Sequence, residues 1–139
     1  MTTLYDHIEN SDIEGVRRLI KNGVDINKIG DFGLTPLHMA VSSESIDIIE
    51  LLIIEGADVN KVDDNGNPPI LLVGSQDEKI IKMLLEYGAN PNIKNSDGRT
   101  ILDVAYDENL IDLVQLLLNY GAKGTIKPSD YGLSDDNYL

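Results

Sequence analysis

The strongest constraint on the fold is a phrase that recurs four times at almost constant spacing. In its clearest form, at residues 51–60, it reads Leu-Leu-Ile-Ile-Glu-Gly-Ala-Asp-Val-Asn. The glycines of the four copies follow one another at steps of 33, 32 and 33 residues, as Gly23, Gly56, Gly88 and Gly121. A period of this length indicates stacked units, each of which buries its apolar face against its neighbours. The sequence therefore predicts a solenoid, an architecture that offers a long concave surface rather than a catalytic pocket.

The second unit shows the anatomy most clearly. Thr35 is a residue type that caps helices and Pro36 fits the first helical turn, so a helix is predicted from there through Ser42. The apolar residues between positions 46 and 53 predict a second helix with a wide apolar face. Gly56 ends that helix, because glycine readily adopts the left-handed conformation found at helix C-termini. Each unit is therefore expected to contain a turn, a helix, a loop and a second helix. The predicted core between the units comprises Ile48, Ile49, Leu51, Leu52, Met83, Leu84, Leu116 and Leu117.

Two short segments of this unit carry a resemblance to a known family. Residues 35–40 read Thr-Pro-Leu-His-Met-Ala, which matches the Thr-Pro-Leu-His-x-Ala signature of the ankyrin repeat. Residues 56–60, Gly-Ala-Asp-Val-Asn, strengthen the match, and the turn sequence at 63–66, Asp-Asp-Asn-Gly, is a hairpin signal. Along nearly its whole length the chain resembles ankyrin-repeat proteins. The resemblance implies an all-α ankyrin-repeat solenoid of stacked helix-turn-helix units with β-hairpin-like fingers.

The units depart from the signature in different ways. The first has Thr-Leu-Tyr-Asp at 3–6 and is interpreted as an N-terminal cap, since a terminal repeat needs one face that tolerates solvent. The third reads Pro-Pro-Ile-Leu-Leu-Val at 68–73, without the capping threonine and the histidine, and is one residue short near 74–77. The fourth keeps Thr100 but lacks the proline and the histidine. Such irregularity argues against a designed consensus scaffold.

The last residues align with an earlier finger. Ser-Asp-Tyr-Gly-Leu-Ser at 129–134 matches Gly-Asp-Phe-Gly-Leu-Thr at 30–35, which predicts the finger of a truncated fifth unit. A frayed polar tail is the alternative for the final residues, 135–139. The chain is therefore interpreted as a single domain over residues 1–139. Its units are an N-terminal cap at 2–29, repeats at 30–62, 63–94 and 95–128, and the truncated finger or tail at 129–139.

Composition narrows the classes of partner. The 139 residues are 42% hydrophobic, enough for one domain with a real core. The 24 acidic and 11 basic residues give a net charge of −13, which argues against nucleic acid and anionic membranes and favours a basic partner protein. Solubility alone is the alternative explanation of this charge. Without cysteine, a membrane-length apolar run or signal-peptide features, the chain is expected to be a soluble cytoplasmic protein.

No residue constellation in the sequence predicts catalysis. The resemblance implies structural roles for His38, which would link the backbones of neighbouring loops, and for Thr35, which would fix a helix start. His7 falls where the second unit has Ala40 and is expected to be a partly exposed cap residue. A faint calcium-loop pattern begins at Asp63, but proline and glycine occupy its sixth and twelfth positions. Since no phosphate-binding loop or serine elbow occurs either, we expect no enzyme, no cofactor and no metal.

The resemblance also implies binding through the finger tips and the ends of the first helices. Phe32 is the only phenylalanine, and the register places it at an exposed tip beside Leu34, as in an interface hot spot. Packing of Phe32 against a neighbouring finger or the first unit is the alternative. Acidic residues expected on the same face are Glu9, Asp31, Asp64, Asp97, Asp107, Glu108 and Asp130. The predicted partner-binding residues are Asp31, Phe32, Leu34, Ser42, Ser43, Asp64, Asn65, Asn67, Ser75, Gln76, Asp97, Arg99, Tyr106, Asp107, Glu108, Asp130 and Tyr131.

These observations favour a non-enzymatic protein-protein interaction module, a monomer that binds a partner protein through an acidic concave face and the finger tips. The alternative is an acidic immunity or inhibitor protein that blocks a basic toxin or enzyme, such as a nuclease. A third hypothesis is self-association through apolar surface around residues 116–118. An enzyme would need a catalytic group outside the repeats, for which the chain has no room.

Overall fold

The computed structural model describes residues 2–73 and 77–123. Within these residues the regular structure is helical, without strands, which confirms the all-α prediction. Pairs of short helices follow one another along the chain. The 3-10 turn η1 lies between two pairs, and the 3-10 turn η2 takes the place of one helix in the third unit. The elements are α1 (Leu4–Glu9), α2 (Ile13–Lys21), η1 (Asp31–Gly33), α3 (Pro36–Ser42), α4 (Ile46–Ile54), η2 (Pro69–Leu72), α5 (Glu78–Glu86), α6 (Ile101–Asp107) and α7 (Ile111–Asn119).

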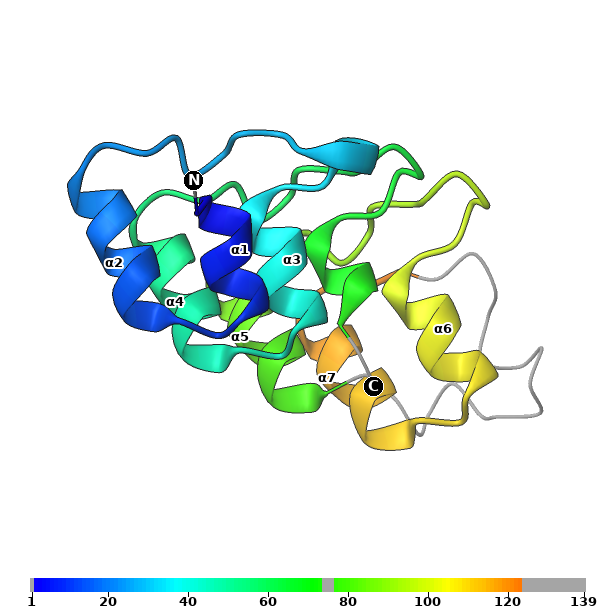
Figure 1. Cartoon of the computed structure of the whole chain (residues 1–139). Coiled ribbons are helices and arrows are strands. Elements are labelled where there is room, and N and C mark those ends of the chain that lie inside the picture. Colours follow the sequence, from blue (N-terminus) through cyan, green and yellow to red (C-terminus); the bar gives the residue numbers. More distant parts are fainter. Residues whose placement is uncertain (1, 74–76, 124–139) are drawn as a thin grey trace.

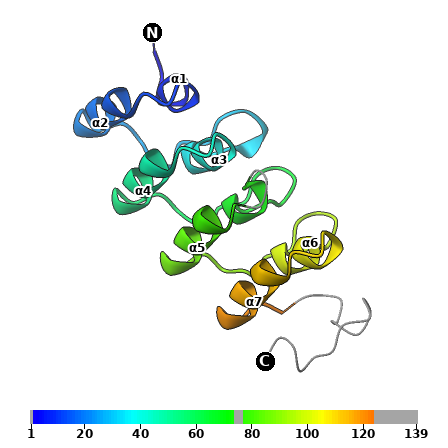
Figure 2. The same ribbon diagram turned by 90° about the horizontal axis from the view of Figure 1, so that it is seen from below.

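The helices form two rows. Figure 2 shows α2, α4, α5 and α7 side by side in an outer row, while α1, α3 and α6 belong to an inner row. The fingers connect each outer helix to the next inner helix, and they line up along one edge of the stack (Figure 1). This is the stacked helix-turn-helix solenoid that the period predicted. None of the helices in the described part of the chain is both long and apolar enough to cross a membrane.

A capping box begins the inner helix in three of the units. In the second, the Thr35 hydroxyl accepts from the backbone N–H of His38, while Nδ1 of His38 accepts from the N–H of Thr35. Thr3 and Thr100 begin α1 and α6 in the same way. In the third unit Pro68 stands at this position and has no side chain that accepts such a bond. The inner element there shortens to the 3-10 turn η2, which is the physical result of the predicted loss of the cap.

The last residue of the repeated phrase joins one unit to the next. The amide of Asn60 donates from Nδ2 to the carbonyl oxygen of Gly88 at 3.2 Å and accepts on Oδ1 from the N–H of Asn90 at 2.7 Å. Asp58 holds Asn60 in place, because its Oδ1 accepts from the Asn60 N–H. The repeated Asp-x-Asn therefore encodes stacking between units rather than a binding function. The equivalent bonds join Asn27 to Gly56 and Asp58, and Asn92 to Gly121 and Lys123.

The predicted core is confirmed for most of its residues, since the structure buries Ile48, Ile49, Leu52, Leu84 and Leu117. Three further predicted core residues are instead half-buried at the edge of that core: Leu51, Met83 and Leu116. Each of the three immediately precedes a fully buried leucine, and one residue turns the side chain by about 100° around the helix axis. These positions therefore lie at the margin of the core, against which they pack.

Candidate binding surface

Phe32 lies at the tip of the first finger with 77% of its surface exposed. The alternative prediction, that it packs against a neighbouring finger or the first unit, is therefore wrong. Phe32 has φ 59° and ψ 20°, and Gly33 has φ 73°, so both lie in the left-handed region. Together with the bond from Leu34 N–H to the Asp31 carbonyl at 3.1 Å, this is a type I′ turn. Asparagine is the residue type that this position favours, so phenylalanine is held there at a conformational cost.

The first finger differs from the next two because of one position. In the second finger, Oδ1 of Asp63 accepts from the N–H groups of Asn65 and Asn67, both at 2.9 Å. In the third finger, Oδ1 of Asn95 accepts from the N–H groups of Asp97 and Arg99 in the same way. The equivalent residue in the first finger is Gly30, which has no side chain to accept these bonds. A Cβ atom on Gly30 would lie 3.0 Å from the ring of Tyr5, so the cap residue fills that space.

Backbone hydrogen bonds tie the finger tips into a row. The carbonyl oxygen of Phe32 accepts from the N–H of Asp64 at 2.9 Å, and the carbonyl oxygen of Asn65 accepts from the N–H of Ser96 at 2.9 Å. The fingers pack closely, because a Cβ atom on Gly33 would lie 2.8 Å from the backbone nitrogen of Asp64. The tips are therefore held at fixed spacing, as the row of loops in Figure 1 shows.

A groove of about 300 Å³ lies at the base of the first finger. Its walls come from the finger and from two inner helices, and they are formed by Tyr5, Gly30, Asp31, Leu34 and Met39. The structure thus brings Asp31 and Leu34 together, but Leu34 is half-buried and lines the groove rather than adding to the tip. We call the tips and this groove the finger face, which comprises Tyr5, Asp31, Phe32, Leu34, Met39, Asp64, Asn65, Ser96 and Asp97.

Sequence reasoning did not find Tyr5 and Met39 as site residues. Met39 stands at the variable position of the Thr-Pro-Leu-His-x-Ala signature, which is a signal that could have placed it on the concave surface. Tyr5 lies in the N-terminal cap, where the signature is absent, and its place beside the finger depends on tertiary packing. Both residues are half-buried, as groove-lining side chains are.

His38 is buried and serves the scaffold. Its Nε2 lies 2.8 Å from the carbonyl oxygen of Asn67 in the next finger, and its Nδ1 accepts from the N–H of Thr35. Burial lowers the pKa of His38, although the bond to the Asn67 carbonyl and the charge of Asp63 act in the opposite direction. The ring is therefore neutral and carries its proton on Nε2. This geometry confirms the link between neighbouring loops that the family resemblance implied.

The comparisons with known protein families agree with this geometry. A family model described as ankyrin repeats (3 copies) matches residues 47–128, and one described as ankyrin repeats (many copies) matches residues 4–53. The chain belongs to the ankyrin-repeat family. No curated protein matches it. Ankyrin repeats are generally protein-protein interaction modules and typically not catalytic.

The other contact residues predicted on the ankyrin inner helices differ in how exposed they are. Ser42, Ser43 and Glu108 are exposed where α3 and α6 end. Tyr106 is 2% exposed and belongs to the hydrophobic core, so its prediction as a surface contact is wrong. It lies one residue before the exposed end of α6, and that one step turns its ring inward. Among the predicted contacts, Ser75, Gln76, Asp130 and Tyr131 lie outside the described residues.

Charge on the ankyrin finger tips is acidic. Asp31, Asp64 and Asp97 are exposed, one in each of the three fingers that the described residues contain. Asp107 differs, because its carboxylate forms an ion pair with the guanidinium of Arg99 at the base of the third finger. An exposed carboxylate therefore stands at each of these tips, while at the end of α6 Asp107 is paired and Glu108 is exposed. Within residues 2–73 and 77–123, no three histidine, aspartate or glutamate side chains are grouped to hold a metal ion.

Proposed function

We propose that this ankyrin-repeat protein binds a partner protein through the finger face, without catalysis. The observation that carries the proposal is Phe32, an aromatic side chain that is 77% exposed on a left-handed backbone. The stack gains little from this residue, because its ring lies in water and asparagine would suit the turn better. An exposed aromatic side chain surrounded by polar groups is typical of an interface anchor.

The finger face offers a preformed surface. The tips are fixed by the bonds from Phe32 to Asp64 and from Asn65 to Ser96, so little conformational entropy is lost when a partner binds. In the proposed complex, the Phe32 ring enters an apolar pocket of the partner. An apolar side chain of the partner in turn occupies the groove between Tyr5 and Met39. The protein acts as a monomer, and light scattering that gave a concentration-dependent mass would contradict this.

A second candidate function is inhibition of a basic protein. The net charge of −13 and the exposed carboxylates of Asp31, Asp64 and Asp97 favour it. Such a surface would increase the rate of association with a basic toxin or enzyme and would cover the active surface of that protein. Affinity that falls steeply between low and high salt supports this candidate, because mobile ions screen exposed charges. Binding that does not depend on salt would contradict the inhibitor hypothesis and leave the general interaction module as the proposed function.

The test is affinity capture from a lysate of the source cells, analysed by mass spectrometry. Phe32→Asn should reduce capture of the specific partner by about tenfold or more, since hot-spot truncations have effects of this size. Tyr87→Asn is the matched control, because Tyr87 is also an exposed aromatic residue but follows the outer helix α5. Equal capture by wild type and Phe32→Asn would place the binding site elsewhere.

A further inference from the structure

We propose a second interaction surface on the outer row of helices, where a groove between α2 and α4 fits a basic amphipathic helix of a partner protein. The groove has a volume of about 420 Å³. α2 and α4 lie side by side in the outer row, on the opposite side of the stack from the inner helices (Figure 2). We call it the outer groove, and the residues on which the argument rests are Ile13, Asp47, Glu50, Leu51, Ile54 and Glu55.

Ile54 breaks the repeat pattern at the end of α4. The equivalent last positions of α2, α5 and α7 are Lys21, Glu86 and Asn119, all polar. Ile54 is 61% exposed, so its aliphatic side chain contributes little to the core. The scaffold therefore accepts a polar residue at this position in every other described unit, and the isoleucine in the second unit calls for another explanation. Contact with a partner's apolar side chain supplies one.

The groove residues of α4 and its C-cap, Glu55, lie along one stripe. Asp47, Glu50 and Leu51, Ile54 and Glu55 are spaced by three or four residues, which places them above one another on the same face. The stripe spans about 12 Å, since each helical residue rises about 1.5 Å. Leu51 and Ile54 give it an apolar centre, and Ile13 of α2 completes the apolar floor from the other side.

Charge identifies the kind of partner. Asp47, Glu50 and Glu55 are exposed and flank the apolar residues of the stripe. Arg17 of α2 also lines the groove, but its Nε lies 3.9 Å from Glu14 of its own helix. The groove is therefore acidic overall. A helix that presents aliphatic residues on one side, with lysine or arginine beside them, complements both the apolar floor and the carboxylates.

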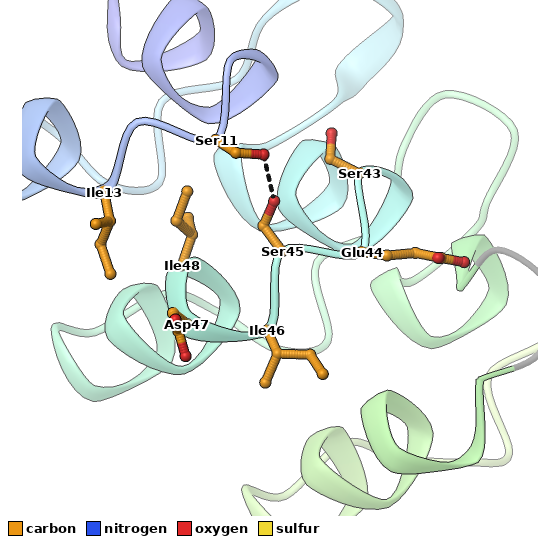
Figure 3. A pocket seen from close by; sticks show the side chains of 8 residues that line it. All are labelled: Ser11, Ile13, Ser43, Glu44, Ser45, Ile46, Asp47 and Ile48. Atoms are coloured by element: carbon orange, nitrogen blue, oxygen red, sulfur yellow. Dashed lines mark hydrogen bonds between the residues drawn. The ribbon is translucent and has the colours of Figure 1, made fainter.

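A neighbouring hollow extends the outer groove toward the turns between the helices. This hollow of about 580 Å³ shares Ile13 and Asp47 with the groove. In Figure 3 the Ser11 and Ser45 hydroxyls, 3.0 Å apart, join the two interhelix turns above Ile48. Ile46, 37% exposed, adds a further aliphatic side chain at this end of α4.

The test is an NMR titration with ¹⁵N-labelled protein and a synthetic leucine-lysine peptide of about 14 residues, whose leucines fall on one helical face. We expect amide shifts on α2 and α4, and weaker binding of a scrambled peptide of equal charge. Ile54→Asn should raise the dissociation constant about tenfold, because it removes the apolar anchor. Glu50→Gln should raise it about threefold and reduce its salt dependence.

Two controls make the result decisive. Ile54→Asn introduces the residue that α7 carries at the same position, so its thermal midpoint should stay within about 2 °C of wild type. Phe32→Asn should leave peptide affinity unchanged, which separates the outer groove from the finger face. Amide shifts confined to the fingers, equal binding of the scrambled peptide, or unchanged affinity of the folded Ile54→Asn protein would each overturn the proposal.

Discussion

The hydroxyl oxygen of Tyr5 lies 2.8 Å from the carbonyl oxygen of Leu34, at the base of the first finger. Leu34 is equivalent to Asn67 of the second finger, whose carbonyl oxygen accepts from Nε2 of His38. The cap unit lacks the signature histidine, yet Tyr5, which lies in the first turn of α1 as His38 does in that of α3, supplies the same bond to the next finger. The finger that carries Phe32 is therefore positioned by the cap.

Tyr5→Phe should destabilise the fold by about 1 kcal/mol, because it leaves a partly buried carbonyl oxygen without its hydroxyl donor. The hydroxyl also lies 2.5 Å from the carbonyl oxygen of Lys28, so its single O–H is shared between two backbone carbonyls and both lose a contact. Urea unfolding followed by circular dichroism measures the change. Tyr87→Phe serves as the control at an exposed tyrosine. Equal midpoints for the two variants would mean that the Tyr5 hydroxyl does not hold the finger.

His7 and Gly15 are complementary in size. A Cβ atom on Gly15 would lie 2.1 Å from Nδ1 of His7, which is 2.9 Å from Oδ2 of Asp12. The second unit reverses the pair, with Ala40 and Ile48 at the equivalent positions. Gly15→Ala should therefore cost about 1–2 kcal/mol in wild type, since it displaces the imidazole. In a His7→Ala background the cost should be smaller, because only Oδ2 of Asp12, 2.6 Å from the added Cβ atom, must then move.

A double-mutant cycle of His7→Ala and Gly15→Ala, measured by chemical unfolding, gives the coupling directly. Additive effects would show that the two side-chain positions do not share space in solution.

Phe32→Asn should raise the free energy of unfolding by about 0.5–1 kcal/mol, because asparagine adopts the left-handed turn conformation at lower cost. The same variant is expected to lose partner binding, so stability and binding move in opposite directions at this residue. Differential scanning calorimetry measures the first effect. A lower thermal midpoint for Phe32→Asn would mean that the exposed ring contributes packing to the fold.

Asn60→Ala removes two bonds between the second and third units, to Gly88 and Asn90. We expect a loss of about 1–2 kcal/mol, since both backbone partners must then be satisfied by water alone. The exposed Asn22, at the end of α2, gives the control variant Asn22→Ala. Hydrogen exchange should show faster opening at Asn90, and unchanged exchange there would contradict the stacking role of Asn60.

Stability should decrease as the pH falls below about 6.5, the ordinary pKa of histidine. The folded state lowers the pKa of His38, so the unfolded chain takes up the proton first and is favoured as the pH drops toward the folded pKa. Above pH 6.5 both states hold the ring neutral and the effect is absent. Urea unfolding at pH 7.5 and 5.5 measures it. If the folded His38→Gln protein showed the same dependence of stability on pH, the effect would come from other titratable groups.

Much of the fold follows from local sequence signals. The threonines before α3 and α6, the proline at Pro36 and the glycines that end the outer helices act over a few residues, so they can be recognised without a structure. The candidate site was predicted in part. Phe32 was placed at a tip because the register of the repeat is regular there, whereas Tyr106 was misplaced because one residue decides which way an α6 side chain points.

The sequence by itself determined the period, the stacking of the units and the face that the fingers form, because the same short-range signals recur in each unit. Tertiary structure alone decided that Tyr5 replaces the signature histidine and that Phe32 lies on a strained turn. It also set Ile13 of α2 beside the stripe that Ile54 and three carboxylates form on α4. The Tyr5 bond and the groove between α2 and α4 depend on contacts between units about 30 residues apart, where packing rather than local propensity sets the geometry.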